Sequence, residues 1–479
     1  MSLVLGTLII VISIASQSTP KLIDLYTKDQ VSLIYIWFLT AAAAHNLWLQ
    51  LYVSGGGSAR ESSVLLNTYV LLPLGLILAL PYIIYILRYT KPGNVIDKIY
   101  NENSKRINLL RHKAYFVLLN HKKMTERYQF RLFDSLNQLD DLLEYVSFKE
   151  PKGDIIHKIG LTVIEYIKIK KELNPKFFII SPKIKSDISF KTMTGQFDVV
   201  ERTKTFYEQK AFRLIGNAYF KLIEKNDFDL ASQCVFKLSE CGKQAIECDD
   251  DDLTNTVIIR FNTILRFGIK HGLKNKEVRN IYNALFHYSE FIKHLIVHNK
   301  NDLIKQSCTF LKIYGTETYK HSRQEPSFTF LVDVFAMELK KALIELDKHN
   351  YSQEFQKGVL ELLLELDNPP DFDRDELGQT RIINDGVRVL QVGLSLYYLS
   401  VDNHELVERI INDILEDYRL LGSDLKIAVD STCKKLQIFT PTFWEDTDRG
   451  NANLYYVPEK DKIPRFKELF YEKYEKLPK

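Results

Sequence analysis

The 479-residue chain has few cysteines, and their number and spacing exclude two common kinds of structural site. Its five cysteines are too few and too scattered to form a disulfide framework. Three of them, Cys234, Cys241 and Cys248, recur at intervals of seven residues and would share one face of a helix. At ~1.5 Å per residue such neighbours lie roughly 10 Å apart, too far to share a zinc ion through bonds of ~2.3 Å. The sequence therefore predicts buried, apolar cysteines without a metal.

The sequence also lacks the short motifs of familiar catalytic sites. No glycine-rich phosphate loop follows a predicted strand, and neither a GxSxG elbow nor an HExxH motif occurs. The 11 histidines do not pair with carboxylates at ligand spacing. No cofactor is predicted, and enzymatic activity is disfavoured, although a site assembled from distant segments would leave no such motif.

Two acidic stretches resemble cation sites but lack what a cation needs. The four aspartates at 249–252 cannot converge on one ion without a special loop, so we expect a solvated turn in which an aspartate caps the next helix. Asp371, Asp373 and Asp375 alternate as in a calcium loop, but Ile382 stands where the twelfth-position glutamate is needed. No metal site is predicted.

Long runs without charge occupy the first ninety residues. The runs at 31–53 and 62–87 would each be long enough as a helix to cross the ~30 Å hydrocarbon layer of a bilayer. A shorter apolar run, Leu3 to Ala15, could be a short span, a signal segment or an interfacial helix. We therefore predict a transmembrane region over residues 1–90, with spans near 3–16, 31–53 and 64–87.

Basic residues follow the last of these runs. Five Lys and Arg residues lie between positions 88 and 106, whereas Arg60 alone separates the second and third runs. Positive-inside counting therefore puts the C-terminal bulk in the cytoplasm. Residues 91–150 are predicted to form a basic amphipathic helical collar that would attract anionic lipids of the bilayer. Nucleic-acid binding is not predicted, because no recognition motif accompanies the basic residues.

Three polar residues interrupt the second uncharged run: His45, Asn46 and Gln50. Asn46 and Gln50 are four residues apart and so share a helix face. Polar groups in such a run should face other helices or water. Two interpretations stay open at this point: hydrogen bonds between helices of a bundle or oligomer, or a polar stripe along the path of an ion or solute.

Two short segments resemble a known family. Gln17, Ser18, Thr19, Pro20 and Lys21, followed by Leu22, resemble the "S-S-Q-x-S-P-R-L" turn of a large bacterial family of predicted membrane proteins, the domain of unknown function twenty-two fifty-four. TFYEQKAFRLIGNA at 205–218 is similar to the family's "T-x-E-Q-D-x-A-F-G-L-R" segment, with Arg213 in place of the glycine. The resemblance implies a divergent, N-terminally shortened member: a multi-pass protein of the bacterial inner membrane with a large cytoplasmic C-terminal domain and no established activity. The 17–21 segment is interpreted as a cytosolic turn, or alternatively as the lining of a pore mouth.

The remaining chain divides at about residue 200. Residues 151–200 are interrupted by Pro151, Pro175, Pro182 and Gly195 and contain the β-rich runs LTVIEYIKI and KFFIIS, which favour a small mixed or β module. Residues 201–479 read as nearly continuous helix with turn signals about 19 to 28 residues apart, so that two intervals approach the period of HEAT repeats. We predict an antiparallel α-helical array there, with an irregular bundle as the alternative.

One polar and aromatic stretch of the C-terminal region is a candidate for partner contact. It is FWEDTDRGN at 443–451, and exposed loops of this kind often carry recognition. Its candidate residues are Trp444, Glu445, Asp446, Asp448 and Arg449.

The sequence thus predicts a mainly α protein with N-terminal transmembrane helices, a small mixed or β segment and a large cytosolic α-helical array. The function favoured by this architecture is a non-enzymatic membrane-anchored scaffold or sensor whose helical domain binds a cytosolic protein. The alternative is a homo-oligomeric channel or transport component gated by the helical domain, because one chain has too few spans to enclose a pore.

Overall fold

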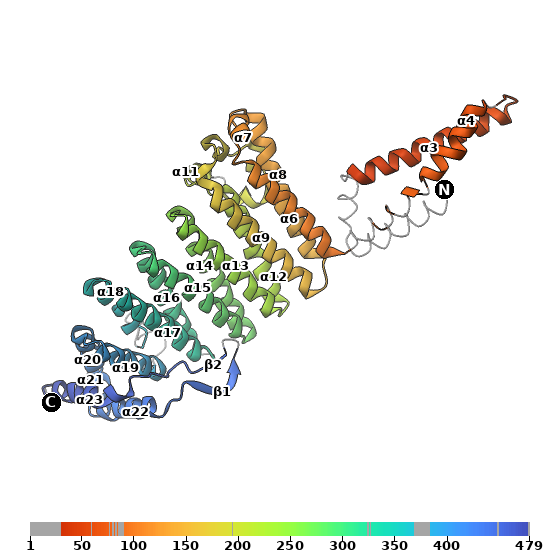
Figure 1. The fold of residues 1–479 in the computed structure, drawn as a ribbon. Helices are drawn as coiled ribbons and strands as arrows, with labels where there is room; N and C mark the ends of the chain where they lie inside the picture. Colours follow the sequence, from red (N-terminus) through yellow and green to blue (C-terminus); the bar gives the residue numbers. More distant parts are fainter. Residues whose placement is uncertain are drawn as a thin grey trace. The chain divides into compact units, whose positions relative to one another are not determined.

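The computed structural model describes residues 30–58, 60–75, 77, 78, 81, 84, 91–193, 195–322, 325, 327–367, 384–447 and 450–477 (Figure 1). The chain divides into two compact units, Met1–Ala211 and Phe212–Lys479. The boundary falls within helix α12, Phe206–Glu224.

The N-terminal residues that the structure describes form a helical hairpin. Helix α3 spans Gln30–Ser54, helix α4 spans Glu61–Leu66, and a π-helical turn, η1, covers Asn67–Leu71. Large apolar side chains of α3 are exposed, among them Ile34 and Trp37 at 70% and 72%. Exposed apolar groups gathered on one element usually mark an interaction surface.

Within the described residues, no helix combines the length and the apolar character needed to cross a membrane. As far as the described residues extend, this finding contradicts the predicted N-terminal transmembrane helices, and with them the predicted multi-pass inner-membrane localisation. The prediction rested on the absence of charged residues, but an uncharged run can still contain polar side chains. Helix α3 has 25 residues but includes the polar side chains of Gln30, His45, Asn46 and Gln50, and α4 has only six residues. The predicted span at 3–16 lies outside the described residues, and the one at 64–87 is described only in part.

The rest of the first unit is built from four main helices. These are α6 (Pro92–Leu109), α7 (Lys113–Leu118), α8 (Lys122–Tyr145) and α9 (Lys149–Ile169). Helices α6 and α9 pack together, and both contact α8. Helices are thus present throughout the region predicted as an amphipathic collar, and Ile107, Leu136 and Leu139 are fully buried as their spacing indicated.

Residues 151–200 contain no strand among those described, so the predicted mixed or β module is wrong. The run LTVIEYIKI lies in α9, where Ile155, Ile156, Ile159, Val163 and Tyr166 are all buried. That spacing follows the helical period of 3.6 residues, which outweighed the β preference of branched side chains. Short helices follow: η2 (Lys170–Glu172), η3 (Pro175–Phe178), α10 (Pro182–Lys185), η4 (Ile188–Met193) and α11 (Phe197–Arg202). The prolines that begin η3 and α10 start helices at their favoured first position.

The second unit is a succession of helix pairs. After α12 come α13 (Phe228–Glu247), α14 (Asp251–Asn275), α15 (Arg279–Val297), α16 (Asn301–Ser322), α17 (Ser327–Lys348), α18 (Gln353–Leu364), α19 (Asp385–Ser400) and α20 (His404–Glu416). The C-terminal end comprises α21 (Tyr418–Leu421), α22 (Asp424–Ile438), the antiparallel strands β1 (Thr442–Thr447) and β2 (Gly450–Ala452), η5 (Lys460–Lys462) and α23 (Ile463–Tyr474).

The same turn closes four successive helix pairs. Asp249, Asn299, Asn350 and Asp402 adopt left-handed backbone conformations, with φ between 52° and 57°. The residue after each donates its N–H to a carbonyl five residues back, for example Asp250 to Ala245 at 3.0 Å and Asn403 to Tyr398 at 2.9 Å. This is the Schellman arrangement, and Asn and Asp tolerate the left-handed conformation better than other non-glycine residues. The four turns are 50, 51 and 52 residues apart, which defines the repeat.

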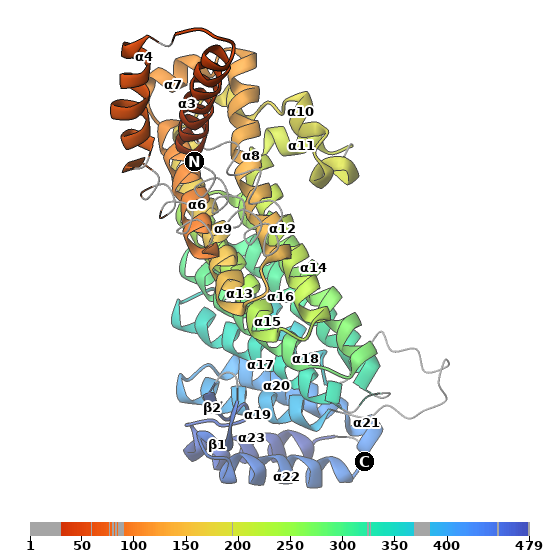
Figure 2. The ribbon, with the colours of Figure 1, turned by 90° about the vertical axis from the view of Figure 1, so that its right-hand side faces the viewer.

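The repeats stack in two layers (Figure 2). The first helices, α13, α15, α17 and α19, pack on one another, and the second helices, α14, α16, α18 and α20, pack on one another beside them. Hydrogen bonds join equivalent parts of neighbouring repeats, such as Tyr397 to Asp347 at 2.9 Å and Gln306 to Asn255 at 3.0 Å. The second unit is therefore a helical repeat-like array, as the sequence predicted.

Candidate functional site

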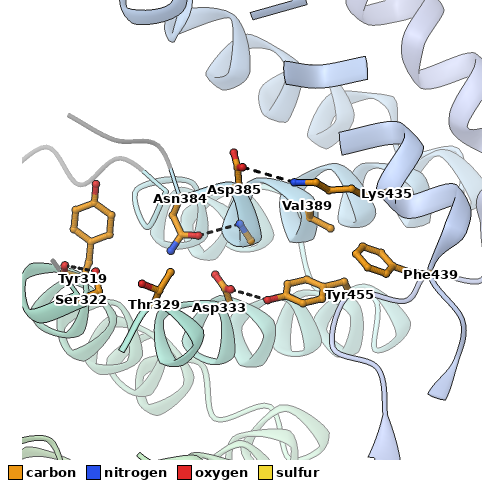
Figure 3. A pocket seen from close by; sticks show the side chains of 11 residues that line it. Tyr319, Ser322, Thr329, Asp333, Asn384, Asp385, Val389, Lys435, Phe439 and Tyr455 are labelled. Atoms are coloured by element: carbon orange, nitrogen blue, oxygen red, sulfur yellow. Dashed lines mark hydrogen bonds and ion pairs between the residues drawn. The ribbon is translucent and has the colours of Figure 1, made fainter. Parts of the chain in front are cut away.

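A cavity of about 510 Å³ lies in the second unit where four helices and a loop meet (Figure 3). Because its residues come from the start of α17 and of α19, it lies at the end of these helices away from the turns at Asn350 and Asp402. The lining comprises Tyr319 and Ser322 of α16, Thr329 and Asp333 of α17, and Asn384 to Gly386 and Val389 at the start of α19. It is completed by Lys435 of α22, by Phe439, which caps the end of α22, and by Tyr455 of the loop before η5.

Asp333 is the central polar group of the cavity. Its side chain is only 5% exposed, and the Tyr455 hydroxyl donates to Oδ2 at 2.7 Å. Oδ1 is buried and has no partner of hydrogen-bond geometry among the described residues. Burial raises the pKa of Asp333 to about 6, although the hydrogen bond from Tyr455 and the nearby side-chain amide of Asn384, which does not reach hydrogen-bond geometry, both act in the opposite direction. A largely buried carboxyl group therefore lines the cavity.

Gly386 makes this position of Asp333 possible. A Cβ atom on Gly386 would lie 2.1 Å from Asp333 Oδ2, so any larger residue would displace the carboxylate. The neighbouring Asn384 caps α19, because its Oδ1 accepts from the N–H groups of Gly386 and Val387 at 3.0 and 3.3 Å. The first turn of α19 is thus satisfied locally and leaves Asp333 Oδ1 unpaired.

The rim of the cavity combines one ion pair with aromatic walls. Lys435 Nζ lies 3.6 Å from Asp385 Oδ2, and these side chains are 45% and 82% exposed, so the pair contributes little to stability. The rings of Phe439 and Tyr455 stack with centroids 5.5 Å apart. The buried Tyr319 adds a third ring.

A second buried charge lies on α17 outside the cavity lining. Lys340 is seven residues after Asp333 and 4% exposed, and among the described residues it forms no hydrogen bond or ion pair. Its Nζ packs against Gly393 of α19, where an added Cβ would lie 3.0 Å away. Burial lowers the pKa of Lys340 to about 8, and the attraction of Glu459 only partly opposes this.

A third polar cluster is fully paired. Arg388 of α19 donates from Nε to Asp367 at 3.0 Å, and its terminal nitrogens also contact Asp367 and Asp417. Burial lowers the pKa of Arg388, but the two carboxylates more than offset this and raise it overall. The cluster joins the end of α18 to α19 and to the start of α21 and is a structural element.

The polar residues predicted on α3 belong to the other unit. His45 Nδ1 lies 2.9 Å from Asn67 Oδ1, and Asn67 Nδ2 donates to Asn46 Oδ1 at 2.7 Å. Gln50 is exposed. His45 and Asn46 thus hydrogen-bond to Asn67 in the π-helical turn of the same chain, and the two interpretations of these residues stay predictions.

The other predicted sites fall partly outside the described residues. Trp444, Glu445 and Asp446 lie in β1, so this part of the predicted partner loop is a strand of a small hairpin. Asp448 and Arg449 lie outside the described residues, as do the turn Gln17–Lys21 and the aspartates at 371–375. Asp250 accepts from Leu253 N at 3.1 Å and caps α14, as predicted for the aspartate run.

Of the three cysteines predicted to be buried, Cys234 and Cys241 are buried and Cys248 is half-buried. All five cysteines are free thiols, and Cys308 and Cys433 are also buried. In the part of the chain that the structure describes, no cluster of His, Cys, Asp and Glu could hold a metal ion.

Sequence reasoning missed Asp333, Asn384 and Tyr455. A signal for Asp333 was available, because Leu331, Val332, Val334, Phe335 and Ala336 around it are apolar and buried, which leaves a carboxylate on a helix with no polar face at that level. Asn384-Asp385-Gly386 also has the composition of a helix cap. Nothing local indicates that Tyr455 lies beside Asp333.

Comparison with known proteins leaves the family open. No family model matches the chain, and no curated protein matches it. A solved structure described as "Circular tandem repeat protein with novel repeat topology and enhanced subunit contact surfaces" is similar at 10% identity and a TM-score of 0.38, covering 93% of this chain and 97% of that one. A likeness at this level carries no functional argument. The resemblance to the bacterial family and the predicted lipid, protein and homo-oligomer partners stay predictions.

Proposed function

We propose that the chain is a non-enzymatic scaffold or sensor, and that its helical array binds a ligand in the cavity around Asp333. The observation that carries the proposal is the carboxylate of Asp333, which lines this cavity, is only 5% exposed, and has on Oδ1 no partner of hydrogen-bond geometry among the described residues. An unpaired buried polar group costs ~1–3 kcal/mol, and proteins retain such costs mainly at functional sites. A cavity of this size, with mostly apolar walls and a few polar groups, is typical of a small-ligand site.

The position of the cavity suggests how an occupant would act. In a repeat array each repeat contacts only its neighbours, so stability depends on the junctions between repeats. The cavity takes residues from α16, α17, α19 and α22, which belong to successive repeats and the C-terminal end. A ligand bound there would stabilise the junction between α17 and α19, and so report its presence to a partner bound along the array.

The experiment is a thermal-denaturation screen of the full chain against small molecules grouped as cationic, anionic and neutral. Gly386→Ala is the disabling variant, because its methyl group displaces the Asp333 carboxylate. Gly358→Ala in α18 is the matched control, because no atom lies within 4 Å of its added Cβ.

At least one class should raise the melting temperature of the wild type and of Gly358→Ala, but not of Gly386→Ala. If compounds of all three classes leave the wild type unchanged, or act equally on both variants, the proposal is wrong.

A further inference from the structure

We propose that the cavity binds a small organic cation, a molecule with a protonated amine on an apolar body, with Asp333 as its counter-ion. This inference rests on the proposed function and names the ligand class of the same site. It follows from the charges buried in the molecule, from the rings around Asp333 and from the partners already taken by neighbouring groups.

Among the residues that the structure describes, Asp333 differs from the other buried carboxylates because no ion pair joins it to a cation. Within the described residues five acidic side chains are buried: Glu208, Asp333, Glu338, Asp367 and Asp417. Glu208 pairs with Lys170 at 2.9 Å and Glu338 with Lys341 at 3.2 Å, while Asp367 and Asp417 share Arg388. A buried charge normally has such a partner. Asp333 has no such partner in the described part of the chain and lines a cavity, so a ligand bound there would supply the cation.

The nearest basic side chain of the lining is committed elsewhere. Lys435 pairs with Asp385 at the exposed rim of the cavity. Tyr455 donates to Oδ2 of Asp333, and among the described residues no donor of hydrogen-bond geometry reaches Oδ1, so neither oxygen has a cationic partner there. The N–H groups of Gly386 and Val387 are taken by Asn384, so the start of α19 offers them to no anion.

The aromatic walls favour an organic cation over a metal ion. Cations are attracted to the faces of aromatic rings, and desolvation strengthens the attraction. Tyr319, Phe439 and the stacked Tyr455 provide such rings. Hard metal ions need six or more oxygen ligands, whereas the cavity offers one buried carboxylate.

The test uses isothermal titration of the full chain with butylamine, 2-phenylethylamine and tryptamine. Each amine is compared with the alcohol of the same skeleton, and 3-phenylpropionate serves as the anionic probe. At pH 7.5 we expect at least one amine to bind at least about tenfold more tightly than its alcohol, because a hydrogen bond to a charged group contributes more than one to a neutral group.

Two variants locate the interaction. Asp333→Asn keeps the shape of the side chain and an acceptor for Tyr455, and it should weaken amine binding at least about tenfold while leaving the alcohols within about threefold. Asp385→Asn changes a carboxylate that is 82% exposed at the rim and should weaken amine binding by less than about threefold.

The outcomes separate this inference from the proposed function. If no amine binds better than its alcohol, or if Asp333→Asn binds amines as the wild type does, the cation assignment is wrong. If 3-phenylpropionate or an alcohol binds in a Gly386-dependent manner while the amines do not, the cavity is a ligand site of another class and only this inference fails. Should Asp333→Asn not fold, the comparison of probes on the wild type still decides.

Discussion

The first helices of the array stack in the same way at α13–α15 and at α17–α19, but different side chains fill the two contacts. At α13–α15, Gly242 makes room for the ring of Phe291, which lies 2.5 Å from where a Cβ would be. At α17–α19, Gly386 makes room for the carboxylate of Asp333, and Gly393 for the amine of Lys340. In both contacts glycine lets one helix accept a side chain from its neighbour in the stack, α13 from the later α15 and α19 from the earlier α17.

The difference shows how one backbone arrangement serves two purposes. The apolar contact buries an aromatic ring and stabilises the array. The polar contact buries two charges that form no ion pair among the described residues, at a cost in free energy, and one of them lines a cavity. The cluster at Arg388 on the same helix α19 shows that the fold can pair buried charges, so the unpaired state of Asp333 and Lys340 is not forced by the architecture.

The largest effect is expected from Arg388→Met, which removes the cation from a paired cluster. Asp367 and Asp417 would then be buried without a counter-charge, and the free energy of unfolding should fall by about 3–5 kcal/mol. Urea denaturation of the full chain measures this, with Arg465→Met in an exposed surface pair as the control that changes it by less than about 1 kcal/mol. If Arg388→Met lowers the free energy of unfolding no more than the control does, then Arg388 does not stabilise the two buried carboxylates.

Lys340→Met should have the opposite sign. The folded-state pKa of Lys340 is lowered from 10.5 to about 8, so the folded chain holds this proton less tightly than the unfolded chain. The destabilisation is therefore fully present below pH 8 and disappears as the pH rises to about 10.5, and at ~1.4 kcal/mol per pKa unit it reaches about 3 kcal/mol.

We expect the methionine variant to be more stable than the wild type by up to that amount at pH 7, with a difference that shrinks toward pH 10.5. Denaturation at pH 7 and at pH 10 measures both values. Lys348→Met at the exposed end of α17 is the control, and an equal change in that variant would count against the interpretation.

Asp333→Asn should also stabilise the chain, over a different pH range. The folded-state pKa of Asp333 is raised from 3.8 to about 6, so the wild type loses stability as the pH rises through this interval, and the loss is complete above pH 6. The groups facing Asp333 are Tyr455, Asn384, Asp385 and, across the rim, Lys435.

The variant should gain about 2–3 kcal/mol over the wild type at pH 7 and nothing at pH 3.5, while losing the amine binding proposed above. Denaturation at the two pH values measures the gain. Equal gains at both would show that the charge of Asp333 is not the cause.

The smallest effect is expected at the apolar contact. Gly242→Ala places a methyl group against Phe291 and Val257, and overpacking of this kind costs about 1–3 kcal/mol. Gly358→Ala, where the added methyl group meets open space, should be neutral or stabilising by up to ~1 kcal/mol, because alanine favours helix. Thermal denaturation compares the two variants. Equal melting temperatures would mean that Phe291 and Val257 shift to accommodate the added methyl group at little cost.

The sequence predicted the array because its turns carry local signals. Asp249, Asn299 and Asn350 lie in stretches of polar residues between apolar helices, and the residue type itself suits the left-handed turn. The mixed or β module failed because branched side chains in α9 follow a helical period that was not counted. The prediction of membrane spans was wrong because a run without charged residues can still contain polar ones, as α3 does.

The cavity could not be predicted in the same way, because it depends on distant parts of the chain. Asp333 and Tyr455, which share a hydrogen bond, are 122 residues apart in sequence. The predicted partner loop at 443–451 ends a few residues before Tyr455, but no pattern in it points toward α17. The sequence alone offered two signals for the cavity: the isolated Asp333 on an apolar helix and the helix-cap composition of residues 384–386.

The repeat spacing has a consequence for how the chain folds. Hydrogen bonds such as Gln306 to Asn255 and Tyr397 to Asp347 join residues 51 and 50 positions apart, so each repeat needs only its neighbour in order to form. Folding of such arrays can start in any repeat and spread to the next. The contact between Asp333 and Tyr455 must wait until the chain beyond α22 has been made. During synthesis on the ribosome the array would therefore be assembled first, and its cavity would be completed last.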